Sequence, residues 1–139
     1  MYQSAKNLIV GVISAAITLG ASLTHAGHHE QLQPPAKPGQ VVVVYQGACP
    51  ATSVDAAIDQ VKKVIAYERA NSPVRYSSSP GVWVDGKVGA VDIHDSMASM
   101  KQAFAWQASD ATWSAGYDAV AASCGITVED FSVSILEAR

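Results

Sequence analysis

Apolar residues follow three patterns along the chain, and each pattern predicts an element. The continuous β-branched run VVVVY at 41–45 predicts a strand buried on both faces, and therefore a central strand. Apolar residues then recur every three or four positions to about Asn71, which predicts an amphipathic helix. Thr52 or Ser53 can cap its beginning, and Pro73 disfavours helix beyond its end.

Two short apolar runs separated by two residues follow, and this pattern predicts a hairpin. The pair Asp85-Gly86 separates VWV from KVGAV, and such a pair is typical of a two-residue turn with positive φ at both positions. Pro80 in the first arm predicts an edge strand. In the second arm Asp92 and His94 share one face, and the apolar residues that alternate with them share the other.

Helical spacing returns after the hairpin and is interrupted once. Asp95 or Ser96 can cap this helix, a second cap near Ser109 opens a further helical stretch, and Gly125 is suited to its end. The alternating segment 131–136 predicts a closing, half-buried strand. The order β-α-β-β-α-β, with a broken second helix, predicts an α+β domain with a four-stranded antiparallel sheet of ferredoxin-like topology. The first and third strands are central in that topology.

The first 26 residues have the layout of a secretory signal peptide. Lys6 is the only charged side chain before sixteen uncharged residues at 8–23. Thr24-His25-Ala26 then provides the small residues that precede a signal-peptide cleavage site. The alternative is a membrane anchor, but sixteen residues fall short of the ~20 that span a bilayer. We therefore expect a periplasmic or secreted protein without a stable membrane anchor. Its parts are a signal peptide at 1–26, a polar proline-rich leader at 27–40 and one domain at 41–139.

Composition and charge exclude several classes of function. The chain is mildly acidic, with a formal charge of −3 that becomes −4 when Lys6 is removed, so nucleic acid is not an expected partner. Half of the residues are hydrophobic (49%), which excludes a disordered chain. The sequence has no Gly-rich phosphate loop, Ser-His-Asp spacing or flavin fingerprint, so we expect no resident cofactor.

The two cysteines are predicted to form a disulfide. Cys49 follows the first strand and Cys124 ends the second helix, and the predicted topology brings these points to the same edge of the sheet. Export favours a disulfide over the alternative, two free thiols. The sequence has no Cys-x-x-Cys, which disfavours a redox-active role. Closure of a loop of about 75 residues would contribute about 4 kcal/mol to stability.

The chain resembles the dimeric α+β barrel superfamily, and most closely its NIPSNAP-type and antibiotic-biosynthesis-monooxygenase-like domains. The segments that carry the resemblance are VDIHDSMASMKQAFAW, the D-x-x-W of Asp110 to Trp113 and the closing FSVSIL, within residues 41–137. The resemblance implies a homodimer that pairs two sheets, with a pocket between sheet and helices. Members range from cofactor-free oxygenases and haem-degrading enzymes to proteins with no known catalysis, so the resemblance implies no single reaction.

Two sets of residues inside the domain are candidates for function. His94 and Asp92, about 7 Å apart by strand rise, form a candidate general base or metal ligand with its orienting carboxylate. The alternative for His94 is a structural, hydrogen-bonded histidine. Large rings with polar tips are candidates for ligand binding. These rings are Tyr45, Tyr76, Trp83, Trp106 and Trp113. Trp83 is the best candidate for a pocket rim or dimer interface, whereas ordinary core packing is the preferred interpretation of Trp113.

A third candidate site is the amino terminus that cleavage after Ala26 would create. It would read Gly27-His28-His29. The amine, two deprotonated amides and the imidazole of His29 can hold Cu(II) or Ni(II) in a square plane, with His28 as a further donor. The alternative is a plain polar leader.

Together these patterns favour an exported homodimer that binds a small, largely apolar ligand between sheet and helices. The first alternative is a cofactor-independent monooxygenase or isomerase that uses His94 and Asp92. The second is periplasmic Cu(II) binding through the mature amino terminus.

Overall fold

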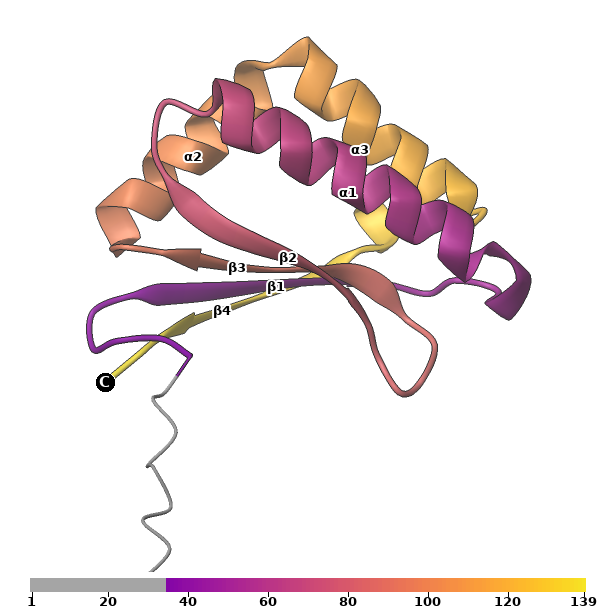
Figure 1. The fold of residues 1–139 in the computed structure, drawn as a ribbon, viewed down its shortest axis with the longest axis horizontal. Helices are drawn as coiled ribbons and strands as arrows, with labels where there is room; N and C mark the ends of the chain where they lie inside the picture. The colour runs from indigo at the N-terminus through magenta and orange to yellow at the C-terminus, as the bar shows by residue number, and fades with distance from the viewer. Residues whose placement is uncertain (1–34) are drawn as a thin grey trace, which may run out of the picture. The chain divides into compact units, whose positions relative to one another are not determined.

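In the computed structural model, which describes residues 35–139, four strands form one sheet and three helices cover one of its faces (Figure 1). Two short 3-10 turns, η1 (Ala51–Ser53) and η2 (Val128–Asp130), complete the domain. In chain order the strands and helices are β1 (Val41–Gly47), α1 (Val54–Asn71), β2 (Tyr76–Val82), β3 (Val88–His94), α2 (Met97–Ser109), α3 (Ala111–Ser123) and β4 (Ser132–Glu137).

The sheet has the strand order β2-β3-β1-β4, and its three neighbouring pairs are antiparallel. This arrangement is compatible with a ferredoxin-like fold, and it confirms that the first and third strands are central. Pro80 lies in β2, an edge strand, as its missing N–H predicts. Within residues 35–139, no helix is long and apolar enough to span a membrane.

Most helix boundaries follow the capping signals of the sequence, but the predicted side-chain cap of α1 is absent: Ser53 precedes the helix and makes no capping hydrogen bond, because it ends the 3-10 turn η1. α1 ends at Asn71, two residues before Pro73. The break in the second helix lies at Asp110, whose side chain accepts a hydrogen bond of 2.8 Å from the backbone N–H of Trp113 and so caps α3. Gly125 follows α3 with a positive φ of 70°, as expected of a residue that terminates a helix.

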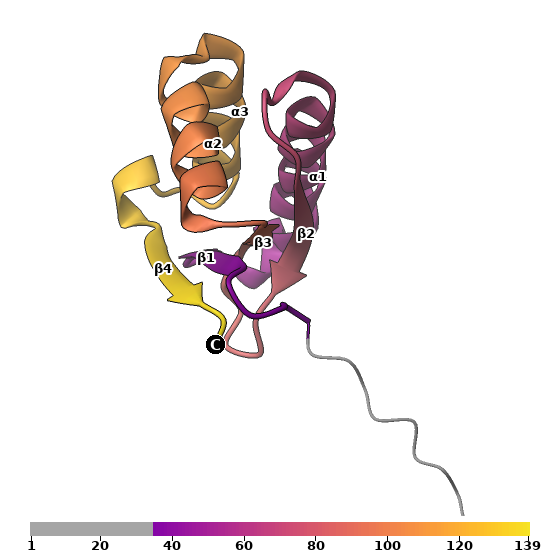
Figure 2. The ribbon, with the colours of Figure 1, turned by 90° about the vertical axis from the view of Figure 1, so that its left-hand side faces the viewer.

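The core lies between the sheet and the helical layer, and Figure 2 shows this layering end-on. Its larger cluster joins α1 and α3 to the sheet through Ala57, Val61, Ile65, Val88, Val120, Ala121, Cys124 and Phe131. A smaller cluster joins β1 to α2 through Val41, Val43 and Met100. The burial of these side chains supplies most of the driving force for folding.

Strands β1 and β4 are less buried than the sequence predicts. In β1, Val43 is fully buried toward the helices, but Val42 and Val44 on the other face are half-buried. β4 is exposed along its whole length, even on the helix-facing side, where Val133 and Ile135, the partners of Tyr45 and Val43, remain 48% and 49% exposed. Alternation correctly predicts which residues share a face, but the described residues contain no second layer over the outer face.

The β2–β3 turn also differs from the predicted two-residue turn. The N–H of Trp83 donates to the carbonyl oxygen of Lys87 at 2.9 Å, so the loop contains three residues, 84–86. Within it the N–H of Gly86 donates to the carbonyl oxygen of Trp83 at 2.8 Å, and Gly86 has a φ of 84°. A turn followed by a glycine of positive φ is the common form of a three-residue hairpin loop.

Candidate functional site

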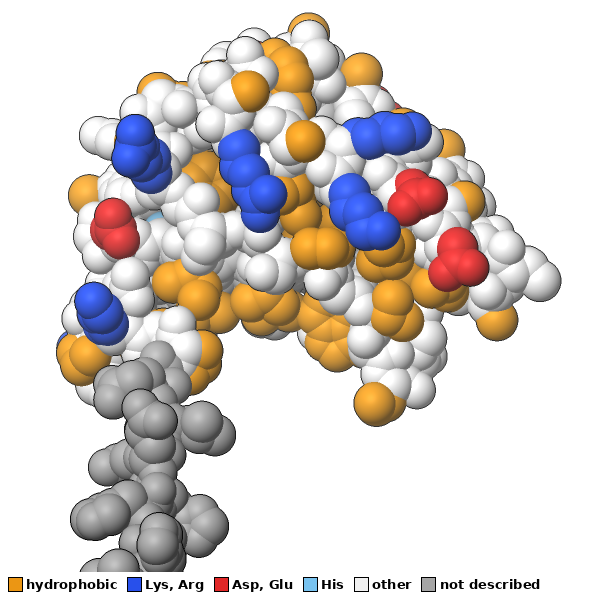
Figure 3. Space-filling view, in the orientation of Figure 1, with side chains coloured by type: hydrophobic (Ala, Val, Ile, Leu, Met, Phe, Trp, Pro, Cys, Tyr) orange, Lys and Arg blue, Asp and Glu red, His pale blue; other side chains and the backbone are white. Residues whose placement is uncertain are grey.

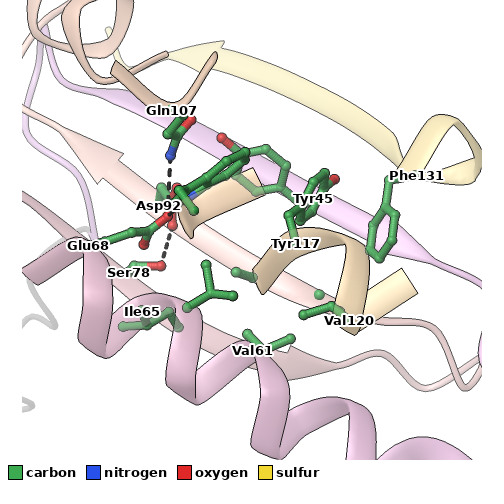
Figure 4. Close-up of a pocket in the computed structure, with 14 residues that line it drawn as sticks. Tyr45, Val61, Ile65, Glu68, Ser78, Asp92, Gln107, Tyr117, Val120 and Phe131 are labelled. Carbon is green, nitrogen blue, oxygen red and sulfur yellow. Dashed lines mark hydrogen bonds between the residues drawn. The ribbon is translucent and has the colours of Figure 1, made fainter. Parts of the chain in front are cut away.

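A cavity lies between the sheet and helices α1 and α3 (Figure 4). Its volume is about 40 Å³. This is well below the ~300–1,000 Å³ of typical small-molecule sites. Most of the wall is apolar or aromatic, and four polar side chains interrupt it. The lining residues are Tyr45, Val61, Val64, Ile65, Glu68, Ser78, Gly89, Ala90, Asp92, Gln107, Trp113, Tyr117, Val120 and Phe131.

Asp92 enters this cavity from β3 because its position in the alternation faces the helices. It is 2% exposed, and its carboxylate accepts a hydrogen bond from the hydroxyl of Ser78, its cross-strand partner in β2. Burial raises the pKa of Asp92 to about 7; the Ser78 hydrogen bond opposes this shift, and the charge of Glu68 adds to it. Near neutral pH this carboxyl can therefore hold or release a proton.

Glu68 is the second buried acid, and it comes from the last turns of α1. Only 6% of it is exposed, and its Oε1 accepts hydrogen bonds from Nε1 of Trp113 at 2.7 Å and Nε2 of Gln107 at 3.2 Å. Burial raises the pKa of Glu68, and hydrogen bonds from Trp113, Tyr76 and Gln107 partly offset the rise. Figure 4 shows Glu68, Asp92, Ser78 and Gln107 together at one end of the cavity.

Tyr45 supplies a third polar group from β1. Its hydroxyl is buried and has no hydrogen-bond partner among residues 35–139. Burial raises the pKa of this phenol far above its usual value, and the nearby charge of Asp92 adds to the rise, so the hydroxyl stays protonated. The cavity thus offers two carboxyls and one unsatisfied hydroxyl to a guest that is otherwise surrounded by apolar side chains.

His94 shares the helix-facing side of β3 with Asp92, as predicted, but it does not line the cavity. Its ring is fully buried, stacks on Tyr76 with ring centroids 4.5 Å apart, and meets Phe104 edge-on at 6.2 Å. Neither ring nitrogen has a hydrogen-bond partner in the described part of the chain. Burial lowers the pKa of His94, although Asp95 opposes the shift, so the ring is held neutral.

The predicted ligand-binding rings are divided between the cavity and other places. Tyr45 and Trp113 line the cavity, and Tyr76 adjoins it through the hydrogen bond that its hydroxyl accepts from the Gln107 amide. Trp106 instead stacks on a tyrosine of α1 with ring centroids 6.2 Å apart. Trp83 lies between the end of β2 and the hairpin loop, outside the lining.

Three polar residues of the site did not stand out in the sequence: Glu68, Ser78 and Gln107. A signal existed for Glu68, because it follows Val61 and Ile65 at helical spacing and so continues the buried stripe of α1. A carboxyl at a buried position of an apolar helix stripe is therefore a sign of a polar site within the core. Ser78 becomes identifiable only when the register places it opposite Asp92.

The disulfide between Cys49 and Cys124 is present, as predicted, and the two Cα atoms lie 4.5 Å apart. It joins the loop after β1 to the end of α3 across a sequence separation of 75 residues. Cys124 is part of the larger core cluster, so the crosslink also anchors α3 to the sheet.

The predicted copper site at Gly27, His28 and His29 lies outside the described residues. Within residues 35–139, no group of three or more His, Cys, Asp or Glu side chains is placed to hold a metal ion. No protein-family model matches the chain, and neither does any curated protein or solved structure with which it was compared. The side chains of the cavity are therefore what points to a function.

Proposed function

We propose that the protein binds a small, largely apolar ligand in the cavity between the sheet and helices α1 and α3. The observation that carries this proposal is an apolar cavity with buried polar groups gathered at one end (Figure 4). Ligand sites generally combine apolar walls with a few polar groups that orient the ligand. A guest with one hydrogen-bonding group would satisfy the Tyr45 hydroxyl, which lacks a partner among the described residues.

The binding experiment blocks the cavity with a larger side chain on the sheet. Ala90 lies on the helix-facing side of β3 and lines the cavity, so Ala90→Leu should occupy the space a ligand needs. The matched control is Ala105→Leu, at an exposed position of α2. A neutral probe, 4-phenylbutanol, should shift the amide NMR signals of cavity residues in the wild type and in Ala105→Leu but not in Ala90→Leu. Equal binding to the folded Ala90→Leu variant would place the ligand elsewhere.

The second candidate is proton-transfer catalysis, as in an isomerase or a cofactor-independent monooxygenase. It is supported by Asp92, whose pKa of about 7 suits a general base at neutral pH and whose carboxyl faces an apolar cavity. His94 does not line the cavity, so the proton-transfer role falls to Asp92, with the Tyr45 hydroxyl as a donor to a developing oxyanion.

Deuterium exchange tests this candidate without knowledge of the natural substrate. In D₂O the wild type should accelerate exchange of the α-protons of 4-phenyl-2-butanone, and the rate should rise through an apparent pKa of about 7. Asp92→Asn should remove the acceleration. A wild type that exchanges the probe no faster than Asp92→Asn would rule out Asp92 as the base.

The protein is further proposed to be a homodimer that pairs through the outer face of the sheet. That face carries partly exposed apolar side chains, and Figure 3 shows apolar side chains gathered along the strands below the helical layer. They include Val42, Val44, Val91, Ile93 and Leu136. Native mass spectrometry at micromolar concentration should give a dimer that Val44→Lys disrupts and Ala66→Lys, on the exposed face of α1, does not. A monomeric wild type would contradict the pairing.

Export to the periplasm or the cell exterior is proposed on the signal-like first 26 residues and is compatible with the disulfide. Amino-terminal sequencing of the protein from its own cells should begin at Gly27. A cytoplasmic protein that retains residues 1–26 would contradict export.

A further inference from the structure

A larger hollow adjoins the cavity and shares part of its wall. Glu68 and Ser78 line both spaces. The hollow has a volume of about 490 Å³ and the cavity about 40 Å³. The hollow is within the size range of small-molecule sites, whereas the cavity holds only the end of such a molecule. A ligand that occupied both spaces would have to pass between Glu68 and Ser78.

The hollow is lined by two of the three arginines of the chain, Arg69 and Arg75. Arg69 reaches from α1 to β2, where its Nη2 donates to the carbonyl oxygen of Ser78 at 3.3 Å. Within residues 35–139, neither guanidinium has a carboxylate oxygen within 4.0 Å. A guanidinium has five N–H donors, so Arg69 keeps several for a ligand after this bond.

We infer that the ligand carries an oxyanion group, a carboxylate or a phosphate, that binds Arg69 and Arg75 in the hollow while its apolar end enters the cavity. This inference rests on the proposed ligand-binding function and names the chemical class of the ligand. Guanidinium groups bind planar carboxylates and phosphates through paired N–H donors. The ligand class is thus an amphipathic acid with one apolar end.

The surroundings of the two arginines make them necessary for this binding. α1 ends at Asn71 beside the hollow, and the carboxyl end of a helix carries partial negative charge. Glu68 also lines the hollow, but its Oε1 is bound to Trp113 and Gln107 on the cavity side. Without the guanidiniums, these groups would repel an anion.

The test compares three probes that share one apolar tail: 4-phenylbutyrate, 4-phenylbutyl phosphate and the neutral 4-phenylbutanol. Calorimetry at low ionic strength should show that at least one anion binds the wild type about tenfold more tightly than the alcohol does. Arg69→Gln with Arg75→Gln should abolish that preference and leave the affinity for the alcohol unchanged. Lys62→Gln with Lys101→Gln removes the same charge from exposed positions outside the hollow and should preserve the preference.

The outcomes separate this inference from the proposed function. Equal affinity of the wild type for all three probes would overturn the anionic head group and leave apolar binding in place. A preference for anions that survives the double arginine variant would overturn the roles of Arg69 and Arg75. Anion binding that survives Ala90→Leu would show that the hollow acts without the cavity and would also overturn the inference. Failure of every probe to bind at millimolar concentration would refute the proposed function itself.

Discussion

Replacement of Asp92 by Asn should stabilise the protein at pH 8 and change its stability little at pH 4. The folded protein raises the pKa of Asp92 from 3.8 to about 7, chiefly through burial. Between these two values the folded state binds a proton that the unfolded chain has released, so the free energy of unfolding falls as the pH rises. Below about pH 4 both states are protonated, and the penalty is absent.

The size of the effect follows from the shift. Each pKa unit corresponds to 1.36 kcal/mol, so a shift from 3.8 to about 7 gives an upper bound of about 4 kcal/mol above pH 7. Asn cannot ionise, and its side-chain oxygen can still accept the hydrogen bond from Ser78. The variant should therefore escape the cost of a buried charge while keeping the local geometry.

Urea unfolding from pH 4 to pH 8 measures this difference. Wild-type stability should fall over that range, and the fall should be shallower in Asp92→Asn. Some slope should remain, because the pKa of Glu68 is also raised by burial. Asp118→Asn, at an exposed position of α3, is the control and should follow the wild type. Parallel curves for wild type and Asp92→Asn would refute the assignment of a protonated, buried Asp92.

Three further predictions concern the framework of the site. Gly89→Ala should cost about 2 kcal/mol or more in urea unfolding, because its Cβ would lie 1.9 Å from a backbone oxygen of β1. Gly81→Ala, with its nearest contact at 3.5 Å, should cost clearly less, and equal costs would contradict this reasoning. Trp113→Phe removes an N–H from the buried glutamate and should cost about 1–3 kcal/mol by the same assay; a neutral result would mean that water replaces it. Reduction of Cys49–Cys124, with the 75-residue separation it closes, should lower the unfolding free energy by about 4 kcal/mol, and no change would refute the entropic estimate.

The order of the elements could be predicted because it depends on local patterns. The valine run of β1 and Pro80 of β2 indicate a central and an edge strand without knowledge of the partners. The Cys49–Cys124 pairing followed from the same topology, since topology alone brings both residues to one edge. Coverage of the outer face could not be predicted, because alternation identifies an apolar face and not the layer that packs on it.

The composition of the site was less predictable because it depends on contacts between distant elements. Alternation correctly places Asp92 and His94 on one face, but it does not reveal that the His94 ring packs against Tyr76, outside the cavity lining. Ser78 becomes a partner of Asp92 only through the β2–β3 register. Glu68 accepts hydrogen bonds from Gln107 and Trp113, which follow it in the chain by 39 and 45 positions. No local pattern in the sequence encodes contacts over such a separation.

The disulfide has a mechanical consequence for the cavity. It ties the end of α3 to the loop after β1, so these two segments cannot separate while the bond is intact. At the Glu68 end of the cavity, the helical layer is joined to the sheet by the short backbone segment 72–75 between α1 and β2. The disulfide and this connection lie at opposite ends of α1, so neither end of the helical layer can move far from the sheet while the disulfide is intact.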